Sequence, residues 1–231
     1  MNVFAINGSP QMDKGNTAMV LAPFVEGMAE SGAEVEVVYA SRLKVKPCAC
    51  GEMSCWNSTP GECVIRDDMQ TIYPKLRRAD ILLLATPVYI PLPGAMQNVI
   101  NRLCPLLDPI LEWRDGRTRA RFRDDVRIRK MALVAVCGWW ELGNFGTVVR
   151  IADELAEDAS VEFAGSVLRP HAHRMKADGE FTDDGLAVVE ALRMAGRELI
   201  AEGRMNLDTL RAIARPLISE QEIRRRYAAQ G

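Results

Sequence analysis

Five strand-like apolar runs recur along the chain, and helical patterns separate most of them. The runs are NVFAIN (2–7), EVEVVYA (34–40), DILLLATP (80–87), MALVAVCG (131–138) and VEFAGSVL (161–168). Helical periodicity occupies 17–31, 68–78, 95–104 and 145–158. This alternation indicates parallel strands joined by helical crossovers, and runs that are apolar on both faces need helices on both sides of the sheet. The sequence therefore predicts an α/β fold with a doubly wound sheet in three layers.

Two segments exceed what a minimal five-stranded domain needs. One is the arginine-rich stretch 113–130, and the other is a helical region from Asp183 to the end. We therefore expect residues 1–170 to form the doubly wound domain, with an insert at 108–130. Residues 171–231 should form a helical C-terminal extension that packs on this domain or on a partner subunit.

Two local signals bear on helix boundaries. SEQE at 219–222 is typical of a capping box, in which Ser219 is the N-cap and Glu222 reaches back to it. The last helix should therefore begin there. Pro74 falls inside the predicted helix 68–78, where it should cost ~3 kcal/mol or kink the helix, so this boundary is the least defined.

Composition narrows the class of protein. A formal net charge of -2 gives no general attraction to nucleic acid or to an acidic membrane surface. No run approaches the ~18 apolar residues of a membrane span, and the start MNVFAING lacks a signal-peptide pattern. We therefore expect a cytoplasmic protein, for which six cysteines favour free thiols, metal or redox chemistry over disulfides.

The stretch INGSPQMDKGNT (6–17) joins the end of an apolar strand to the start of a helix. Helix amino termini present unpaired N–H groups, so Ser9, Thr17 and the amides around Gly15 and Asn16 could cradle a phosphate. A Walker A loop would need Lys and then Ser or Thr after the second glycine, and no G-x-G-x-x-G occurs. The alternative is a plain turn with an asparagine N-cap.

A second connection, TPVYIPLPGAMQNVINRL (86–103), follows the third strand and contains three prolines and Tyr89. In a doubly wound sheet with the flavodoxin strand order, ligands bind beyond the first and third strands. Prolines stiffen such a loop, and an exposed aromatic ring offers a flat face to a planar ligand. The second loop therefore favours a ligand with a planar ring system.

GSPQMDKGNT, CVIRDDM and TPVYIPLPGAMQNVINR, in this order, resemble the NAD(P)H-dependent FMN reductases and iron–sulfur flavoproteins of the flavodoxin-like superfamily. The resemblance covers about residues 1–170 and implies a five-stranded parallel sheet of order 2-1-3-4-5. It also implies three groups of flavin-binding residues. The FMN phosphate would be held by Ser9, Gly15, Asn16 and Thr17, with Pro10 and Gln11 nearby. The isoalloxazine ring would be bordered by Pro87, Val88 and Tyr89, and the third loop, CGWWELGNFG, contributes Gly138, Trp139, Trp140 and Asn144. The two tryptophans could instead belong to the core or to a subunit contact.

Four of the six cysteines lie in one segment, at Cys48, Cys50, Cys55 and Cys63. Four thiolates are enough ligands for zinc or for a four-iron cluster. The first three cysteines of the iron–sulfur members are two residues apart, whereas one, four and seven residues separate these cysteines. We therefore expect a loop with free thiols and no metal at full occupancy, and keep an iron–sulfur cluster as the alternative.

The two remaining cysteines and the histidines have simpler interpretations. Cys104, on an apolar helix face, and Cys137, at a strand end, should be buried small hydrophobes. His171 and His173 have no acidic or thiol partner close by in sequence, so a loop near the ligand crevice is favoured over a metal site.

The insert is strongly basic. Between Arg114 and Lys130 there are eight basic and three acidic residues, a difference of five positive charges. A solvated or subunit-contacting face is one interpretation. The other is that one or more arginines bind the 2′-phosphate of NADPH, since guanidinium binds phosphate in a bidentate manner.

These features favour an FMN-dependent oxidoreductase that moves hydride from NAD(P)H to bound FMN and on to a quinone, a flavin or another small acceptor. The cofactor carries this chemistry, so no dedicated catalytic residue is required. The alternatives are an iron–sulfur flavoprotein that carries electrons between protein partners, and a metal-binding or redox-sensing module. The insert and the tryptophan pair favour the enzyme, and we expect a homo-oligomer, a dimer or a tetramer. The sequence identifies neither the acceptor nor the preferred nicotinamide.

Overall fold

A computed structural model describes residues 1–228 and contains one five-stranded sheet and two small hairpins. All neighbouring strands of the sheet are parallel. In spatial order they are β2 (Glu34–Tyr39), β1 (Asn2–Asn7), β3 (Ile81–Pro87), β6 (Lys130–Val136) and β7 (Glu162–Arg169). The predicted order 2-1-3-4-5 is confirmed, since β6 and β7 are the fourth and fifth strands of this sheet.

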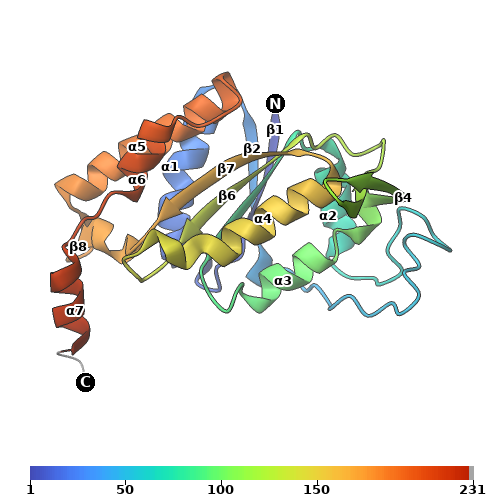
Figure 1. The fold of residues 1–231 in the computed structure, drawn as a ribbon, viewed down its shortest axis with the longest axis horizontal. Coiled ribbons are helices and arrows are strands. Elements are labelled where there is room, and N and C mark those ends of the chain that lie inside the picture. The colour runs from blue at the N-terminus through green and yellow to red at the C-terminus, as the bar shows by residue number, and fades with distance from the viewer. Residues whose placement is uncertain (229–231) are drawn as a thin grey trace.

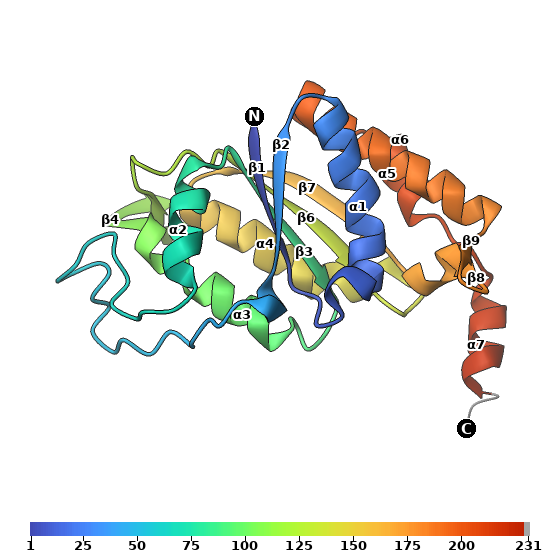
Figure 2. The same cartoon turned by 180° about the vertical axis from the view of Figure 1, so that it is seen from behind.

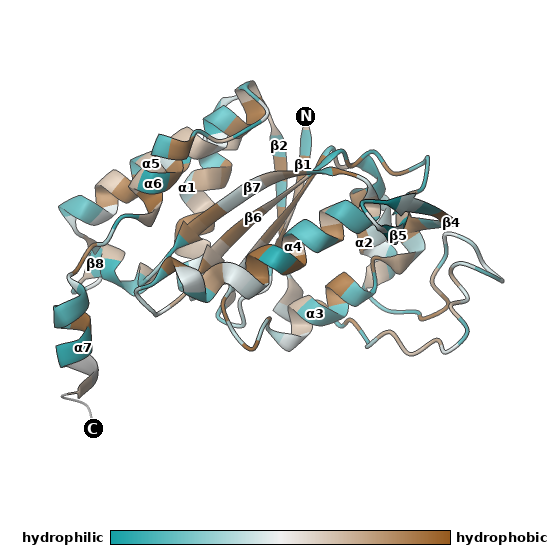
Figure 3. Cartoon of the chain, viewed as in Figure 1, coloured by the Kyte–Doolittle hydropathy of each residue, from teal (hydrophilic) through white to brown (hydrophobic). Residues whose placement is uncertain are grey.

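Helices cover both faces of the sheet, as Figures 1 and 2 show. One face carries α1 (Asn16–Glu30) and α5 (Asp183–Ala201), and the other carries α2 (Met69–Arg78), α3 (Gly94–Asn101) and α4 (Gly146–Ala159). Alternate residues of each inner strand enter opposite cores: Val3 packs with α1 and α5, and Phe4 with α2 and α3. Both cores are apolar, and much of the central sheet is brown in Figure 3.

The first and fifth helices touch through their backbones. A Cβ at Gly27 would lie 2.0 Å from the carbonyl oxygen of Arg193, and one at Gly196 would lie 2.0 Å from that of Phe24. Only glycine fits such a crossing. The expected boundary at residue 170 thus falls between β7 and a helix of the same layered structure, and the division of the chain at this residue remains a proposal.

The C-terminal region continues beyond α5 with α6 (Leu207–Ala214) and α7 (Glu220–Ala228). Figures 1 and 2 show α7 extending away from the body of the molecule. The backbone N–H of Glu222 donates to Ser219 Oγ at 3.2 Å, as expected for the N-cap. Helix α2 runs through Pro74, and buried Ile72, Tyr73 and Leu76 hold it against the core.

The arginine-rich insert contains an antiparallel hairpin of β4 (Leu107–Arg114) and β5 (Arg117–Phe122). Asp115 and Gly116 connect these strands with φ of 50° and 77°, the left-handed values of a type I′ turn. The Asp-Gly pair between two β-prone runs is the sequence signal for this hairpin. A second small hairpin, of β8 (Lys176–Ala177) and β9 (Glu180–Phe181), precedes α5. In residues 1–228 no helix is long and apolar enough to cross a membrane.

Candidate functional site

The loop between β1 and α1 is folded onto itself by its own polar groups. The N–H of Ser9 donates to Asn7 Oδ1 at 2.9 Å, and the N–H of Gln11 donates to Ser9 Oγ at 3.3 Å. A 3₁₀ turn, η1 (Met12–Lys14), then leads to Gly15. A Cβ at Gly15 would lie 2.8 Å from Ser9 Oγ, so this glycine lets the loop close over the start of α1.

At the amino end of α1, buried polar groups lack hydrogen-bond partners among the described residues. Gly15 is the N-cap and Asn16 is the first helical residue, with no side-chain cap bond in the described chain, so the asparagine N-cap is wrong. Thr17 Oγ1 and Asn7 Nδ2 are buried and find no hydrogen-bond partner among residues 1–228. An unsatisfied buried polar group costs about 1–3 kcal/mol, which a bound anion at this helix terminus would offset. The donors therefore fit a phosphate group.

Residues after β2 brace this loop. The 3₁₀ turn η2 (Ala40–Arg42) brings Ser41 Oγ to within 3.5 Å of the Ser9 carbonyl oxygen, to which it donates. Arg42 stacks over the ring of Tyr39 at 4.7 Å and pairs with Asp13 at 3.5 Å. The sequence analysis missed this cation beside the phosphate cradle, although its place directly after a strand, at the carboxyl edge of the sheet, was a usable signal.

The loop after β3 lies at the same carboxyl edge of the sheet as the loop between β1 and α1. The N–H of Val88 donates to the Val136 carbonyl oxygen at 2.8 Å, which ties this loop to the end of β6, next to Pro87. Tyr89 is 51 % exposed and Ile90 is fully exposed. The structure thus places the predicted residues Pro87, Val88 and Tyr89 beside the switch point between β1 and β3, with an aromatic ring facing outward.

The loop after β6 is the third loop at this carboxyl edge of the sheet. Gly138 and Trp139 are exposed, whereas Trp140 is half-buried and its Nε1 donates to the carbonyl oxygen of Ile218 at 3.0 Å. Asn144 Nδ2 donates to the carbonyl and carboxylate of Glu141. The amide of Asn144 and the indole N–H of Trp140 thus bind groups of the protein itself, and Trp139 is the more exposed tryptophan of the pair.

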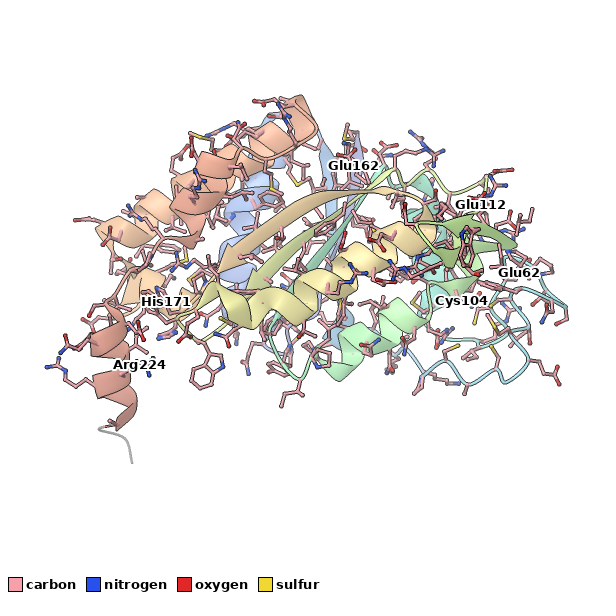
Figure 4. All side chains as sticks on the ribbon, viewed as in Figure 1. Glu62, Cys104, Glu112, Glu162, His171 and Arg224 are labelled. Carbon is pink, nitrogen blue, oxygen red and sulfur yellow. The ribbon has the colours of Figure 1, made fainter. Side chains whose placement is uncertain are left out.

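A buried cation ties the C-terminal region to this loop. Arg169, at the end of β7, donates to the carbonyl oxygens of Ile213 and Arg215, and its Nη2 lies 3.0 Å from His171 Nε2. The same Nε2 accepts the N–H of Leu217 at 3.0 Å. Burial and then the charge of Arg169 lower the pKa of His171 to about 4. Figure 4 shows His171 between the core and α7, so the expected loop histidine is a buried acceptor.

The cysteine segment, residues 43–68, is held at both ends by one buried ion pair. Arg102 binds both carboxylate oxygens of Asp67, at 2.7 and 3.2 Å, and also donates to the carbonyl oxygens of Lys46 and Ile65. Burial alone would lower the pKa of Arg102, but its bond to Asp67 raises it, and the same bond holds the pKa of Asp67 below its usual range. Arg102 therefore holds both ends of the cysteine segment in place.

The thiols of this segment differ in their exposure. Cys48 is exposed, Cys50 is half-buried, and Cys55 and Cys63 are buried. Cys104 differs from its expected place as a buried core residue, because it is half-buried. In the described part of the chain, no three cysteine, histidine or acidic side chains are placed to hold one metal ion. The expectation of free thiols without a fully occupied metal stays a prediction.

The arginines of the insert lie away from the three loops. Arg117 and Arg119 bind Glu154 and Glu157 in the last turns of α4. Arg127 pairs with Asp80, the residue before β3, at 2.9 Å. These arginines therefore stand at the amino edge of the sheet and are neutralised by carboxylates there.

The part of the chain that contains these loops is similar to known flavoproteins. The family of NADPH-dependent FMN reductases matches residues 1–143, which include the first two loops and most of the third. An iron–sulfur flavoprotein of Methanosarcina thermophila is 38 % identical over 91 residues, 39 % of this chain and 45 % of that protein. One of Archaeoglobus fulgidus is 31 % identical over 103 residues, 44 % of this chain and 48 % of that protein. The chain thus spans about half the length of the curated relatives it matches.

Two solved structures share the fold. An NAD(P)H:quinone oxidoreductase from Methanothermobacter marburgensis has a TM-score of 0.59 at 21 % identity, covering 86 % of this chain and 96 % of that one. An FMN-dependent NADH-azoreductase from Bacillus anthracis in complex with FMN has a TM-score of 0.56 at 13 % identity, covering 87 % and 99 %. Because the family match extends over residues 1–143, more than half of the chain, the chain belongs to the NADPH-dependent FMN reductase family.

Proposed function

We propose that this protein is an FMN-dependent oxidoreductase that takes hydride from NAD(P)H and passes reducing equivalents to a small organic acceptor such as a quinone or a flavin. The observation that carries the proposal is the cradle at the amino end of α1. There, buried Thr17 Oγ1 and Asn7 Nδ2 have no partner in the described chain, next to a helix terminus without a side-chain cap. A phosphate ester supplies the missing acceptors.

Each loop has a separate task in this proposal. Ser9, Thr17 and the amides at Gly15 and Asn16 hold the FMN phosphate, and Pro10 and Gln11 shape the turn. Pro87, Val88 and Tyr89 border the isoalloxazine ring, and Gly138 and Trp139 close its other side, with Trp140 and Asn144 supporting that loop. Bound FMN supplies the hydride chemistry, while these residues orient it and exclude water.

The carboxyl edge of the sheet has exposed apolar side chains that a second molecule would cover. Tyr89, Ile90, Trp139 and Leu142 are each about half exposed or more. We infer that NAD(P)H and the acceptor approach over these residues and that a second copy of the chain covers part of them, in a homo-oligomer. The six free thiols suit a reducing compartment such as the cytoplasm.

The test is reduction of the bound flavin. The purified protein should be yellow with about one FMN per chain, and anaerobic mixing with NADH or NADPH in a stopped-flow instrument should bleach the flavin faster than free FMN reacts. Ser9→Ala combined with Thr17→Ala should lose flavin on dialysis. A protein that is colourless and shows no change in the flavin spectrum on incubation with FMN would contradict the proposal.

The similarity to iron–sulfur flavoproteins supports one alternative, an electron carrier between protein partners. The stopped-flow experiment separates the two functions. If the protein holds FMN but neither nicotinamide reduces it faster than free FMN, the carrier is favoured.

A further inference from the structure

A cavity of about 610 Å³ lies between α3 and the two ends of the cysteine segment. Three exposed cations line it, Lys44, Lys46 and Arg66, and we call this cavity the basic pocket. Arg66 donates to the side-chain oxygen of Gln70 at 3.0 Å, and in the described chain none of the three cations has an ion pair. Figure 2 shows the chain leaving β2 beside α3, where these residues lie.

The acidic residues of the basic pocket do not neutralise these cations. Asp67 binds Arg102 with both carboxylate oxygens and also accepts the backbone N–H of Lys46 at 2.9 Å. Asp68 accepts the backbone N–H of Lys44 at 2.7 Å. Since Arg102 neutralises Asp67, the pocket contains three cations and one further carboxylate, a difference of two positive charges.

The backbone that carries the two lysines is held in place by α3. The carbonyl oxygen of Val45 accepts from Asn98 Nδ2 at 3.3 Å, and that of Lys46 accepts from Arg102 Nη1 at 3.0 Å. The side chain of Val45 packs on the core, whereas Lys44 and Lys46 on either side of it are exposed. Residues two apart in an extended chain lie on the same side, so the two ammonium groups are presented together.

We propose that the basic pocket binds the 2′-phosphate of NADPH and thereby selects NADPH over NADH, an inference that rests on the proposed oxidoreductase function. A phosphate monoester carries a charge of about −1.5 to −2 at neutral pH, which matches the difference of two positive charges in the pocket. Its volume is within the range of small-ligand sites, about 300–1,000 Å³. Ala95, in the first turn of α3, also lines the pocket, and the partial positive charge of a helix amino terminus favours the same ligand.

The basic pocket is separate from the phosphate cradle proposed for FMN. The cradle is at the amino end of α1, on one face of the sheet, whereas α3 covers the other face. The turn η2 lies between them, because Ser41 donates to the Ser9 carbonyl oxygen and Leu43 lines the pocket. Arg42, in the same turn, is paired with Asp13. A dinucleotide whose nicotinamide lies on the flavin can therefore extend past this turn to the unpaired lysines.

The test uses adenosine 2′,5′-bisphosphate, which carries the 2′-phosphate but no nicotinamide. Isothermal titration calorimetry of the full-length protein, with any bound flavin retained, should show that this nucleotide binds at least about tenfold more tightly than adenosine 5′-monophosphate. Lys44→Gln with Lys46→Gln should weaken its binding about 10- to 100-fold. The midpoint of thermal unfolding should not fall, because both side chains are exposed. Lys44→Arg with Lys46→Arg keeps both charges and should retain most of the affinity.

The control is Lys75→Gln with Arg78→Gln, which removes two positive charges from α2 beside the amino end of β1 and should leave binding unchanged. Equal affinity for the two nucleotides, no binding of either, or undiminished binding in Lys44→Gln with Lys46→Gln would overturn the proposal. Calorimetry needs no flavin reduction, so the result is separable from the proposed function. Reduction of the flavin by NADH and NADPH at equal rates, without bisphosphate binding, would remove the pocket and keep the oxidoreductase. Bisphosphate binding without flavin reduction would keep the pocket and contradict the oxidoreductase.

Discussion

Thr17 occupies an unusual position for a polar side chain. It is 1 % exposed, lies in the first turn of α1, and its Oγ1 finds no partner among the described residues. A hydroxyl that stays unpaired lowers the stability of the empty protein, but the same hydroxyl can donate to a phosphate oxygen. Binding and stability should therefore respond to its removal in opposite directions.

We predict that Thr17→Val weakens FMN binding about 10- to 100-fold, because one hydrogen bond to a charged group contributes about 1.5–3 kcal/mol. The protein without FMN should unfold at the same or a higher urea concentration, since valine removes an unsatisfied buried hydroxyl. Fluorescence titration with FMN and urea unfolding measure the two quantities. Thr118→Val, at an exposed position on β5, is the matched control. Unchanged FMN affinity in Thr17→Val would place the phosphate elsewhere.

His171 should make stability depend on pH. Its folded pKa of about 4 lies below the ordinary value of 6.5, so the folded protein resists protonation that the unfolded chain accepts. Stability is then complete above about pH 6.5 and falls as the pH decreases toward 4, by about 2 kcal/mol at pH 5. His171→Gln should flatten this dependence in urea unfolding between about pH 7.5 and 5.

At the scale of elements, one ion pair shapes the cysteine segment. The side chains of Arg102 and Asp67 are 1 % and 3 % exposed, and Arg102 also binds backbone carbonyls of the segment. Such a pair is costly to break, because the remaining charge stays buried without compensation. We predict that Asp67→Asn lowers the free energy of unfolding by about 3–5 kcal/mol.

The matched control for that substitution is Asp208→Asn. Asp208 pairs with Arg211 at 3.0 Å on the surface of α6, with both side chains mostly exposed, and such pairs contribute about 0–1 kcal/mol. Chemical denaturation of both variants measures the difference. Equal effects of the two substitutions would show that the clamp does not hold the segment.

The hairpin of β4 and β5 gives a prediction about nicotinamide preference. Arg117 and Arg119 are bound to Glu154 and Glu157 at the amino edge of the sheet. They are therefore not available to the 2′-phosphate of an NADPH molecule that binds at the opposite edge, as we propose. Arg117→Gln with Arg119→Gln should leave the ratio of NADPH to NADH reduction rates unchanged. Arg42→Gln is the variant with which this ratio is compared, because Arg42 lies beside the proposed phosphate cradle. Loss of NADPH preference in the double variant would restore the phosphate-binding role of the insert.

At the scale of the whole molecule, α7 brings the C-terminal end close to the carboxyl edge of the sheet, where we propose that the flavin binds. A groove lies between this helix and the third loop, lined by Trp139, Trp140, Glu141, Glu220, Ile223 and Arg224. Figure 1 shows α7 beyond the carboxyl ends of the strands, away from most of the chain. A helix in this position can contact a second copy of the protein.

We predict that removal of residues 216–231 lowers the oligomeric state and weakens FMN retention. The deletion takes away α7 and the Ile218 carbonyl that accepts from Trp140. Light scattering and flavin content after gel filtration are the measurements, with Ser219→Ala as a milder variant that removes only the N-cap. If light scattering shows that the intact chain is a monomer, the homo-oligomer is wrong.

The sequence alone determined the layered fold and its loops. Hydrophobic periodicity is a local property, so all five strands and the first four helices could be placed from it within a few residues, and the strand-to-helix loop at Ser9 to Thr17 was visible as a glycine-rich connection. The Asp115-Gly116 hairpin had a local signal too. These features depend on residues that are neighbours in the chain.

The tertiary structure decided the contacts between distant residues. Arg102 meets Asp67 across 35 positions, and His171 accepts from Leu217 across 46. The tertiary structure also decided that Arg117 and Arg119 of the insert bind acidic residues of α4 at the amino edge of the sheet, opposite the proposed flavin site. No local pattern contains this information, because ion pairs and hydrogen bonds depend on which faces of the fold the crossovers bring together. The burial of these groups then sets their pKa.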